Sequence, residues 1–399
     1  MGREVQRFVN KTFFFTVDWE LLRRFLQRYA GQIGIDLRSL GEGSTDDRSR
    51  VFEYFLGANE KYPAAMMEDL HRISALSCEL GVVLLRQHAQ AAGVRLVPPG
   101  EASRNGGLHL SPRYLALRTF LDHPAVFDAA SDGLAFRDSR SPAEFAGEAE
   151  GVAPLQTEEA RASFEQQAAE FFNARYKGNY CRVRWYPEDE GISLIVVHGK
   201  EPVTTIAIED DEERPLTFRE MREDTLAYDQ QAGRVKVTAN GDEEKQRLCD
   251  IFAATMLGRP DFFRRPGSRN LYTLARIARE GEAFHLDGHW DPALCEARVI
   301  EIQVDDGARG GWSVTVRDPQ DAVTKLFSLC PHLDLGRARV NYVKLRFAFA
   351  GEKRTRRKTV KLKPPNLASF DRSSLEARVL EHLKRNGFCV PRLQHVSVA

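Results

Sequence analysis

The stretch that decides the fold of the C-terminal part is Arg339–Leu362, which reads RVNYVKLRFAFAGEKRTRRKTVKL. Apolar and polar residues alternate in it as far as Phe349, which is the pattern of a strand with one buried face. Ala350–Lys353 supplies a turn, and the alternation resumes on the other side with Val360 and Leu362. The stretch therefore predicts a β-hairpin that packs one face against a core.

The residues after the hairpin predict a bend followed by a helix. Pro364 and Pro365 cannot continue a strand ladder, because proline has no backbone N–H to donate. Ser373 and Glu376 have the spacing of a capping box, which marks the beginning of a helix. Gly387 marks its end, since glycine accepts the left-handed conformation that helix ends often need.

Length and composition limit the architecture and the electrostatics. A chain of 399 residues is too long for one ordinary core, so we expect two or three domains. Its hydrophobic content of 42% and charged content of 29% are typical of globular proteins. The 57 basic residues are balanced by 57 acidic ones, so any electrostatic attraction to a partner has to be local.

Cysteine usage and hydropathy predict the compartment. The six cysteines form no CxxC pair, which in a chain of this size favours reduced thiols and a cytoplasmic location. Residues 1–10 lack the apolar centre of a signal peptide, and no window approaches the apolar length that spans a bilayer. We therefore expect a soluble, cytoplasmic protein with no membrane partner. Its arginine-rich, compact composition favours a bacterial source.

The first part of the chain has helical periodicity. Asp18 is a candidate N-cap for the first amphipathic helix, and apolar residues recur at helical spacing as far as about residue 175. A segment rich in Gly, Ser and Pro, Asp132–Pro154, is predicted to be a loop-rich linker. We predict an α-helical domain over residues 1–177. Its helices include Met66–Leu84, Pro112–Phe120 and Thr157–Tyr176.

From about residue 178 the pattern changes to short strands rich in valine, isoleucine and aromatic residues. We predict an α+β domain with an antiparallel sheet over residues 178–270, and a C-terminal α+β domain of two ββα repeats over residues 271–399. The fold class is therefore α+β and multidomain, with an N-terminal helical bundle followed by two antiparallel-sheet units. The predicted strands include Tyr180–Tyr186, Gly191–Val197, Val203–Ile208, Arg234–Thr238, Arg298–Val304 and Trp312–Arg317.

Motifs for catalysis or metal binding do not emerge from the sequence. His285, His289 and Cys295 lie close together but lack the standard spacing of zinc ligands. The acidic run Glu209–Glu213 is more typical of a solvated turn than of a divalent-cation site. No GxSxG, GxGxxG or P-loop pattern occurs. We expect no metal and no cofactor, assign no catalytic residue, and leave open whether the chain is an enzyme.

The predicted hairpin carries the one strong local charge. Seven cations and no acid lie between Lys353 and Lys363, and Arg339, Lys344 and Arg346 lie on the preceding strand. Such a ribbon fits the phosphate backbone of DNA or RNA, although basic residues also protect exposed sheet edges from aggregation. The predicted nucleic-acid-binding residues are Lys344, Arg346, Arg354, Arg356, Arg357, Lys358, Lys361 and Lys363.

Three functional hypotheses follow from these patterns. The first is a non-catalytic binding or adaptor protein that contacts nucleic acid through the basic hairpin and a protein partner through the helical domain. Such a protein would suit a multi-component antiviral defence or regulatory system. The second is a divergent metal-dependent hydrolase that uses the acidic run or the histidine cluster. The third is a protein-interaction scaffold that docks partners on its helical bundle.

Overall fold

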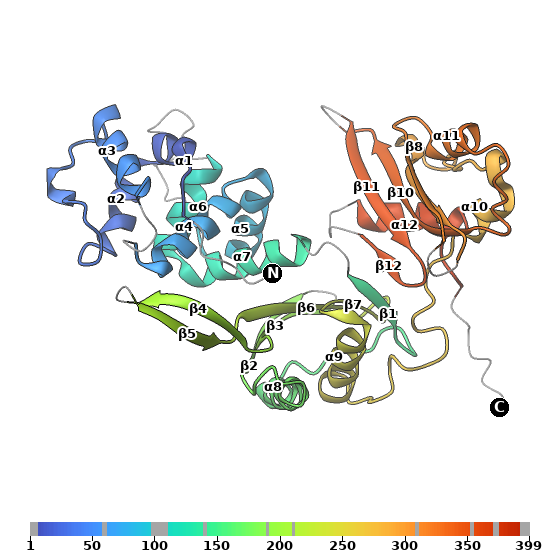
Figure 1. Ribbon diagram of the computed structural model, residues 1–399, viewed down its shortest axis with the longest axis horizontal. Helices are drawn as coiled ribbons and strands as arrows, with labels where there is room; N and C mark the ends of the chain where they lie inside the picture. The colour runs from blue at the N-terminus through green and yellow to red at the C-terminus, as the bar shows by residue number, and fades with distance from the viewer. Residues whose placement is uncertain are drawn as a thin grey trace. The chain divides into compact units, whose positions relative to one another are not determined.

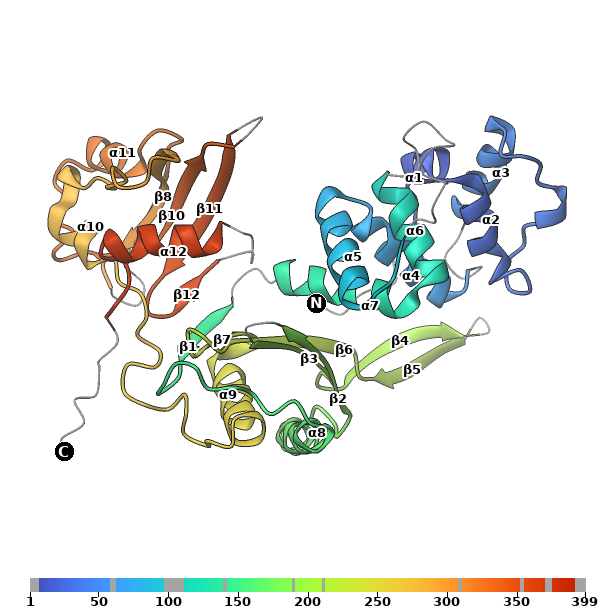
Figure 2. The ribbon, with the colours of Figure 1, turned by 180° about the vertical axis from the view of Figure 1, so that it is seen from behind.

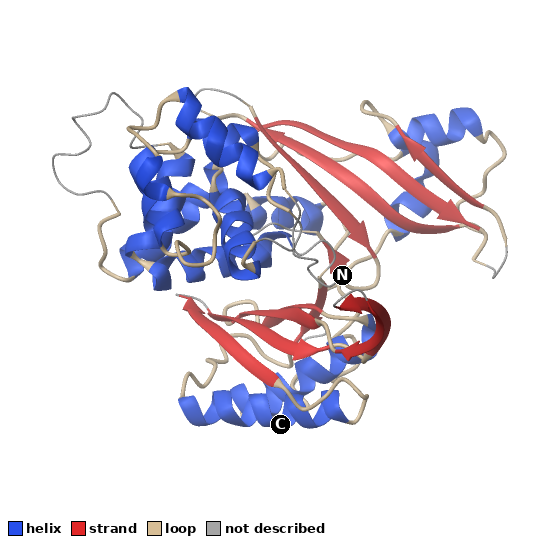
Figure 3. Ribbon diagram, turned by 60° about the vertical axis from the view of Figure 1, so that its left-hand side comes forward, coloured by secondary structure: helices blue, strands red, loops and turns tan. Residues whose placement is uncertain are grey.

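The computed structural model of the protein has the predicted fold class, an α+β arrangement in which helices precede antiparallel sheets (Figures 1 and 3). It divides into two compact units, Met1–Asp138 and Ser139–Ala399, called here the first and the second unit. The structure describes residues 7–57, 62–96, 111–138, 142–188, 191–209, 212–307, 311–351, 355–369 and 375–391.

The first unit is helical in its described parts. Asp18 caps the second helix, as predicted, by accepting a 3.0 Å hydrogen bond from the backbone N–H of Leu21. The apolar stripes of the helices meet in one core, in which Phe14 and Phe55 stack with ring centroids 4.7 Å apart. The helices are α1 (Lys11–Thr16), α2 (Trp19–Gln27), α3 (Thr45–Phe55), α4 (Ala64–Leu76), α5 (Glu79–Ala91), α6 (Pro112–Asp122) and α7 (Pro124–Asp138).

The predicted helix Met66–Leu84 is in fact two helices, α4 and α5. The break falls at Cys78, whose sulfur accepts a hydrogen bond from the N–H of Gly81 and so begins the new helix. A Cβ atom at Gly81 would lie 2.0 Å from the carbonyl oxygen of Leu76, so only glycine permits this close turn. The apolar periodicity runs through the break because both helices face the same core.

A ten-stranded antiparallel sheet organises the second unit, in the order β2-β3-β6-β7-β1-β12-β11-β10-β8-β9. Its strands are β1 (Ala143–Ala146), β2 (Cys181–Glu188), β3 (Gly191–Gly199), β6 (Met221–Asp229), β7 (Arg234–Thr238), β8 (Leu294–Asp305), β9 (Ser313–Arg317), β10 (Arg339–Phe349), β11 (Arg356–Lys363) and β12 (Leu367–Ala368). Two further strands, β4 (Val203–Glu209) and β5 (Glu212–Phe218), form a separate two-stranded sheet.

The large sheet has two halves with separate hydrophobic cores. The first half packs on α8 (Glu158–Asn173) and α9 (Gly241–Met256). The second half packs on α10 (Ala275–Glu280), α11 (Ala322–Leu329) and α12 (Glu376–Arg385). The halves join where β1 pairs with β12. The two predicted α+β units are therefore recognisable, but they share one sheet.

The observed division of the chain differs from the predicted boundary at residue 177. The first compact unit ends at Asp138, and α8 packs against α9 and the sheet of the second unit instead of joining the first. The segment Asp132–Pro154, predicted to be a linker, continues α7 and then forms the buried strand β1. Its four residues AEFA include no β-branched residue, so the strand depends on pairing with β7 and not on local propensity.

Other sequence signals match the structure more closely. Strand β10 has the predicted limits, and Gly387 has a positive φ of 73° after the end of α12. Ser373 of the predicted capping box lies outside the described residues, and α12 begins at Glu376. Strand β5 was not predicted, because its sequence EERPLTF begins with acids and contains proline. In the described part of the chain, no helix has the length and apolar character needed to cross a bilayer.

Candidate nucleic-acid interface

The hairpin of β10 and β11 has one apolar and one polar face. Leu345 and Val360 pair across the strands and belong to the same core as Val379 and Leu383 of α12. Figure 2 shows α12 lying across this inner face. The opposite side is called here the outer face, and is formed by Tyr342, Lys344, Arg346, Arg357, Lys361 and Lys363.

Two of the predicted binding residues on the outer face are neutralised by the neighbouring strand β8. The Nζ atom of Lys344 lies 3.0 Å from Oε2 of Glu301. The Nη2 atom of Arg346 lies 2.9 Å from Oε1 of Glu296. These ion pairs hold β10 to β8, so neither cation is available to a ligand without losing its partner.

Glu301 is the centre of this polar network, although it is only 5% exposed. Its carboxylate accepts hydrogen bonds from the hydroxyl of Tyr342 at 2.7 Å and from Nε of Arg317 at 2.8 Å, in addition to the bond from Lys344. Burial alone would raise the pKa of Glu301, but these hydrogen bonds outweigh it and lower the pKa to about 2. Glu301 is therefore ionised at neutral pH and anchors the outer face.

The other three cations of the outer face, Arg357, Lys361 and Lys363, are in a different situation. Among the described residues, none of them has a carboxylate within ion-pair distance. The Nζ atom of Lys361 lies 4.0 Å from the ring centroid of Tyr342, in a cation–π contact. Burial, followed by the nearby charges of Lys363 and Lys344, lowers the pKa of Lys361.

The remaining predicted residues do not join this group. Arg356 and Lys358 pair with Phe349 and Phe347, so their side chains leave the strand on the inner side, as the alternation predicts. Arg354 lies outside the described residues. The structure therefore brings together a row of three un-neutralised cations, where the sequence offered eight candidates.

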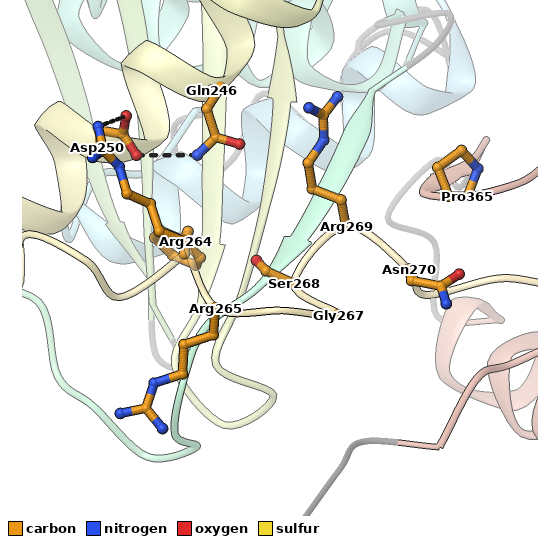
Figure 4. A pocket seen from close by; sticks show the side chains of 10 residues that line it. Gln246, Asp250, Arg264, Arg265, Gly267, Ser268, Arg269, Asn270 and Pro365 are labelled. Carbon is orange, nitrogen blue, oxygen red and sulfur yellow. Dashed lines mark hydrogen bonds and ion pairs between the residues drawn. The ribbon is translucent and has the colours of Figure 1, made fainter.

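A pocket of about 420 Å³ beside α9 is a competing candidate for a binding site. Three arginines line it, but each is paired with an acid: Arg264 with Asp250 at 2.8 Å, Arg265 with Glu148 at 2.6 Å, and Arg269 with Asp242 at 3.4 Å. Figure 4 shows Arg265 and Arg269 pointing away from each other. The polar groups do not converge on a common point, so we assign no ligand to this pocket.

A buried cysteine and histidine face each other elsewhere in the sheet, a proximity that the sequence did not indicate. Cys181 of β2 pairs with His198 of β3, and both are buried. The Nδ1 atom of His198 lies 2.7 Å from the carbonyl oxygen of Gly199, and its Nε2 lies 3.0 Å from Oδ2 of Asp224. Neither nitrogen is free to activate the thiol, and burial raises the pKa of Cys181 to about 12. The pair is structural.

The metal candidates also remain separate. Over the described residues, no three His, Cys, Asp or Glu side chains form a group that could hold a metal ion. Nδ1 of His285 lies 3.3 Å from the carbonyl oxygen of Ala283, and Glu212 and Glu213 lie at the exposed beginning of β5. Asp210 and Asp211 of the acidic run lie outside the described residues.

Comparison with protein-family models gives no match to this chain, and comparison with curated proteins gives none either. Its function therefore has to be inferred from its own residues. The row Arg357, Lys361 and Lys363 beside Tyr342 is the arrangement with the clearest chemistry, since Arg357 and Lys363 are exposed, Lys361 is half-buried, and no described acid neutralises any of the three.

Proposed function

We propose that the chain is a non-catalytic binding or adaptor protein that contacts the phosphate backbone of DNA or RNA through the outer face of β10 and β11. The observation that carries the proposal is the row of un-neutralised cations Arg357, Lys361 and Lys363. Such a row attracts phosphates irrespective of base sequence, because phosphate contacts carry no direct sequence information.

The geometry of the row suits an extended polyanion. Lys361 and Lys363 are two residues apart on one strand, so their side chains leave the sheet about 7 Å apart. Arg357 is four residues before Lys361, which extends the row to about 20 Å. A nucleic-acid strand presents a phosphate about every 3.4 Å of helix axis, so all three cations can find one at the same time.

The number of contacts sets the expected strength of binding. Three phosphate contacts predict that the logarithm of the affinity falls with the logarithm of salt concentration with a slope of about −2.7 on duplex DNA. Lys344 adds a contact only where a phosphate displaces Glu301 from it. We therefore expect modest binding that depends strongly on salt and hardly on sequence.

We also propose that the protein works in the cytoplasm together with a protein partner. All six cysteines are free thiols, which supports a reducing, cytoplasmic compartment. The contact with a protein partner is proposed for the helical first unit. A separate nucleic-acid contact and protein contact are what an adaptor in a defence or regulatory system needs.

The test compares two variants of equal charge. Wild-type protein should bind labelled DNA or RNA at about 50 mM salt, where phosphate contacts are strong. Changing Arg357, Lys361 and Lys363 together to glutamine should abolish most binding and flatten the salt dependence. The matched control changes three exposed arginines elsewhere, Arg23, Arg182 and Arg279, to glutamine.

The control should retain the wild-type affinity and slope. The proposal fails if the wild-type chain does not bind under these conditions, or if the control loses as much affinity as the row variant. In either case the cations of β11 protect a sheet edge and have no ligand of their own.

A further inference from the structure

Strands β4 and β5 form a two-stranded hairpin, called here the arm (residues 203–218), which continues the β3/β6 hairpin beyond the large sheet (Figure 1). At the junction the N–H of Lys200 donates a hydrogen bond to the carbonyl oxygen of Glu220. Its register runs without a shift from Val203 paired with Phe218 to Glu209 paired with Glu212. Beyond this junction the described residues of the arm are almost all exposed and have no third strand, although a two-stranded hairpin usually needs a third strand or a packed face to be stable in water. The arm therefore has the structure of an element that is completed by a partner.

The exposed side chains of the arm are unusually apolar. On one face Ile206 is 64% and Ile208 is 76% exposed, and on the other Val203, Leu216 and Phe218 are exposed as well. Contiguous apolar side chains of this size on a soluble protein mark an interaction surface.

The two edges of the arm differ in their protection. Natural proteins discourage edge pairing with charges and proline. Strand β5 has both, since it contains Glu212, Glu213, Arg214 and Pro215. Strand β4 has a charge only at its end, Glu209, and a proline only before its beginning, Pro202, whereas the stretch between them, Val203–Ile208, reads VTTIAI and has neither. The unprotected edge of the arm is therefore that of β4.

The register also predicts which backbone groups this edge presents. An antiparallel ladder contains hydrogen-bonded pairs and non-hydrogen-bonded pairs. Pro215 has no N–H to donate, so Pro215 and Ile206 must form a non-hydrogen-bonded pair. In an antiparallel ladder the two kinds of pair alternate. The backbone groups of Thr204, Ile206 and Ile208 consequently point outward, toward a strand that is not part of this chain.

We infer that β4 pairs with β4 of a second copy of this chain, antiparallel, about a twofold axis at Ile206. In that register Ile206 faces Ile206 of the other copy, and Thr204 faces Ile208. Every outward N–H then meets an outward carbonyl, because residues 204 and 208 lie at equal distances on either side of the axis. The result is a four-stranded sheet with the isoleucines of both copies clustered on one face.

The charges at the two ends of the arm favour a second copy of this chain as the partner that pairs with β4. Antiparallel pairing places the tip of each arm, with Glu212 and Glu213, beside the base of the other arm. The base carries Arg219, whose guanidinium contacts the main-chain carbonyls of Tyr176 and Lys200 and, in the described part of the chain, no carboxylate. Lys200 at the base is paired with Glu220, and Glu201 beside it is acidic, so Arg219 is the cation of the base that is free to meet the acidic tip of the other copy. Parallel pairing would instead bring the two acidic tips together. The same patch serves both copies, as a twofold interface requires.

The first test measures the mass of the full-length chain in solution by sedimentation. We expect twice the monomer mass of 45.1 kDa. Ile206→Lys places two like charges at the axis and removes two buried isoleucines, so it should weaken the dimer more than about tenfold. Leu216→Lys is the matched control, because Leu216 is also an exposed apolar residue of the arm but lies on β5, away from the pairing edge. It should leave the dimer intact.

The second test fixes the register by cross-linking. Cys78 and Cys295 are exposed and are first changed to serine. In that background Ile206→Cys should form a disulfide-linked dimer under mild oxidation, because residues facing each other across an antiparallel pair have Cα atoms about 5.5 Å apart. Ile208→Cys should not, since its two copies would lie about 14 Å apart along the strands.

Several outcomes would overturn the inference. The wild-type chain could remain a monomer at every concentration, Ile206→Lys could stay dimeric, or Leu216→Lys could dissociate as readily as Ile206→Lys. Equal cross-linking at positions 206 and 208 would also exclude the proposed register. Circular dichroism of each variant verifies that the large sheet still folds, so that a monomeric variant is not merely unfolded.

Discussion

Replacing Glu301 by glutamine tests how much the outer face depends on one carboxylate. The pKa of Glu301 is lowered from 4.5 to about 2 by its partners Tyr342, Lys344 and Arg317. A difference of this size between folded and unfolded states corresponds to about 3 kcal/mol of stability at neutral pH. Glu301→Gln should therefore lower the free energy of unfolding of the second unit by about 3 kcal/mol at pH 7.

The pH dependence distinguishes this charge effect from lost packing. A carboxyl group whose pKa is lowered by folding stabilises the folded state above its unfolded pKa of 4.5, and that contribution disappears as the pH falls toward about 2. Urea unfolding of the wild type and of Glu301→Gln should therefore give a large difference at pH 7 and a much smaller one at about pH 3. Tyr342→Phe removes a single hydrogen bond from the same ionised carboxylate and should cost about 1.5 kcal/mol, less than the loss of the charge. The reasoning is refuted if Glu301→Gln unfolds like the wild type at pH 7, or if its deficit is the same at both pH values.

The Glu301→Gln variant also frees Lys344 and Arg317 from their shared acidic partner. The variant should therefore bind DNA more tightly than the wild type at about 50 mM salt, and its affinity should fall more steeply with salt concentration. Unchanged binding would contradict the proposed role of the outer face. Among the described segments, trypsin should cleave first in the loop 264–270, where exposed arginines lie outside helices and strands, and early cleavage in α4 or α5 would contradict the helical core.

The parts of the fold that the sequence predicts well are those with strong local signals. The prediction of β10 follows from the alternation of its residues, which is clearest from Tyr342 to Phe347. Asp18 and Gly387 mark helix ends through their own backbone preferences. Each of these signals lies within a few residues of the structure it specifies. Long-range pairing is not needed to recognise them.

The features that the sequence did not reveal depend on contacts between distant segments. Strand β1 is specified by pairing with β7, about ninety residues later, and its own four residues have weak strand propensity. Helix α8 has ordinary helical periodicity, which does not tell whether its apolar stripe faces other helices or a sheet. Its assignment to the helical domain was therefore an assumption about tertiary packing, and the structure places it with the sheet of the second unit.

The candidate site shows why a count of charges along a strand gives only an upper limit on ligand contacts. Lys344 and Arg346 look as available as Lys361 and Lys363 in the sequence. Lys344 is neutralised by Glu301, which is 43 residues earlier, and only the pairing of β10 with β8 brings the two together. Strand β11 has β10 on one side and only two paired residues of β12 on the other, so no acidic strand accompanies its cations. The position of each strand in the sheet therefore decides which of its charges can bind a ligand, and position in the sheet is the property that local sequence patterns do not contain.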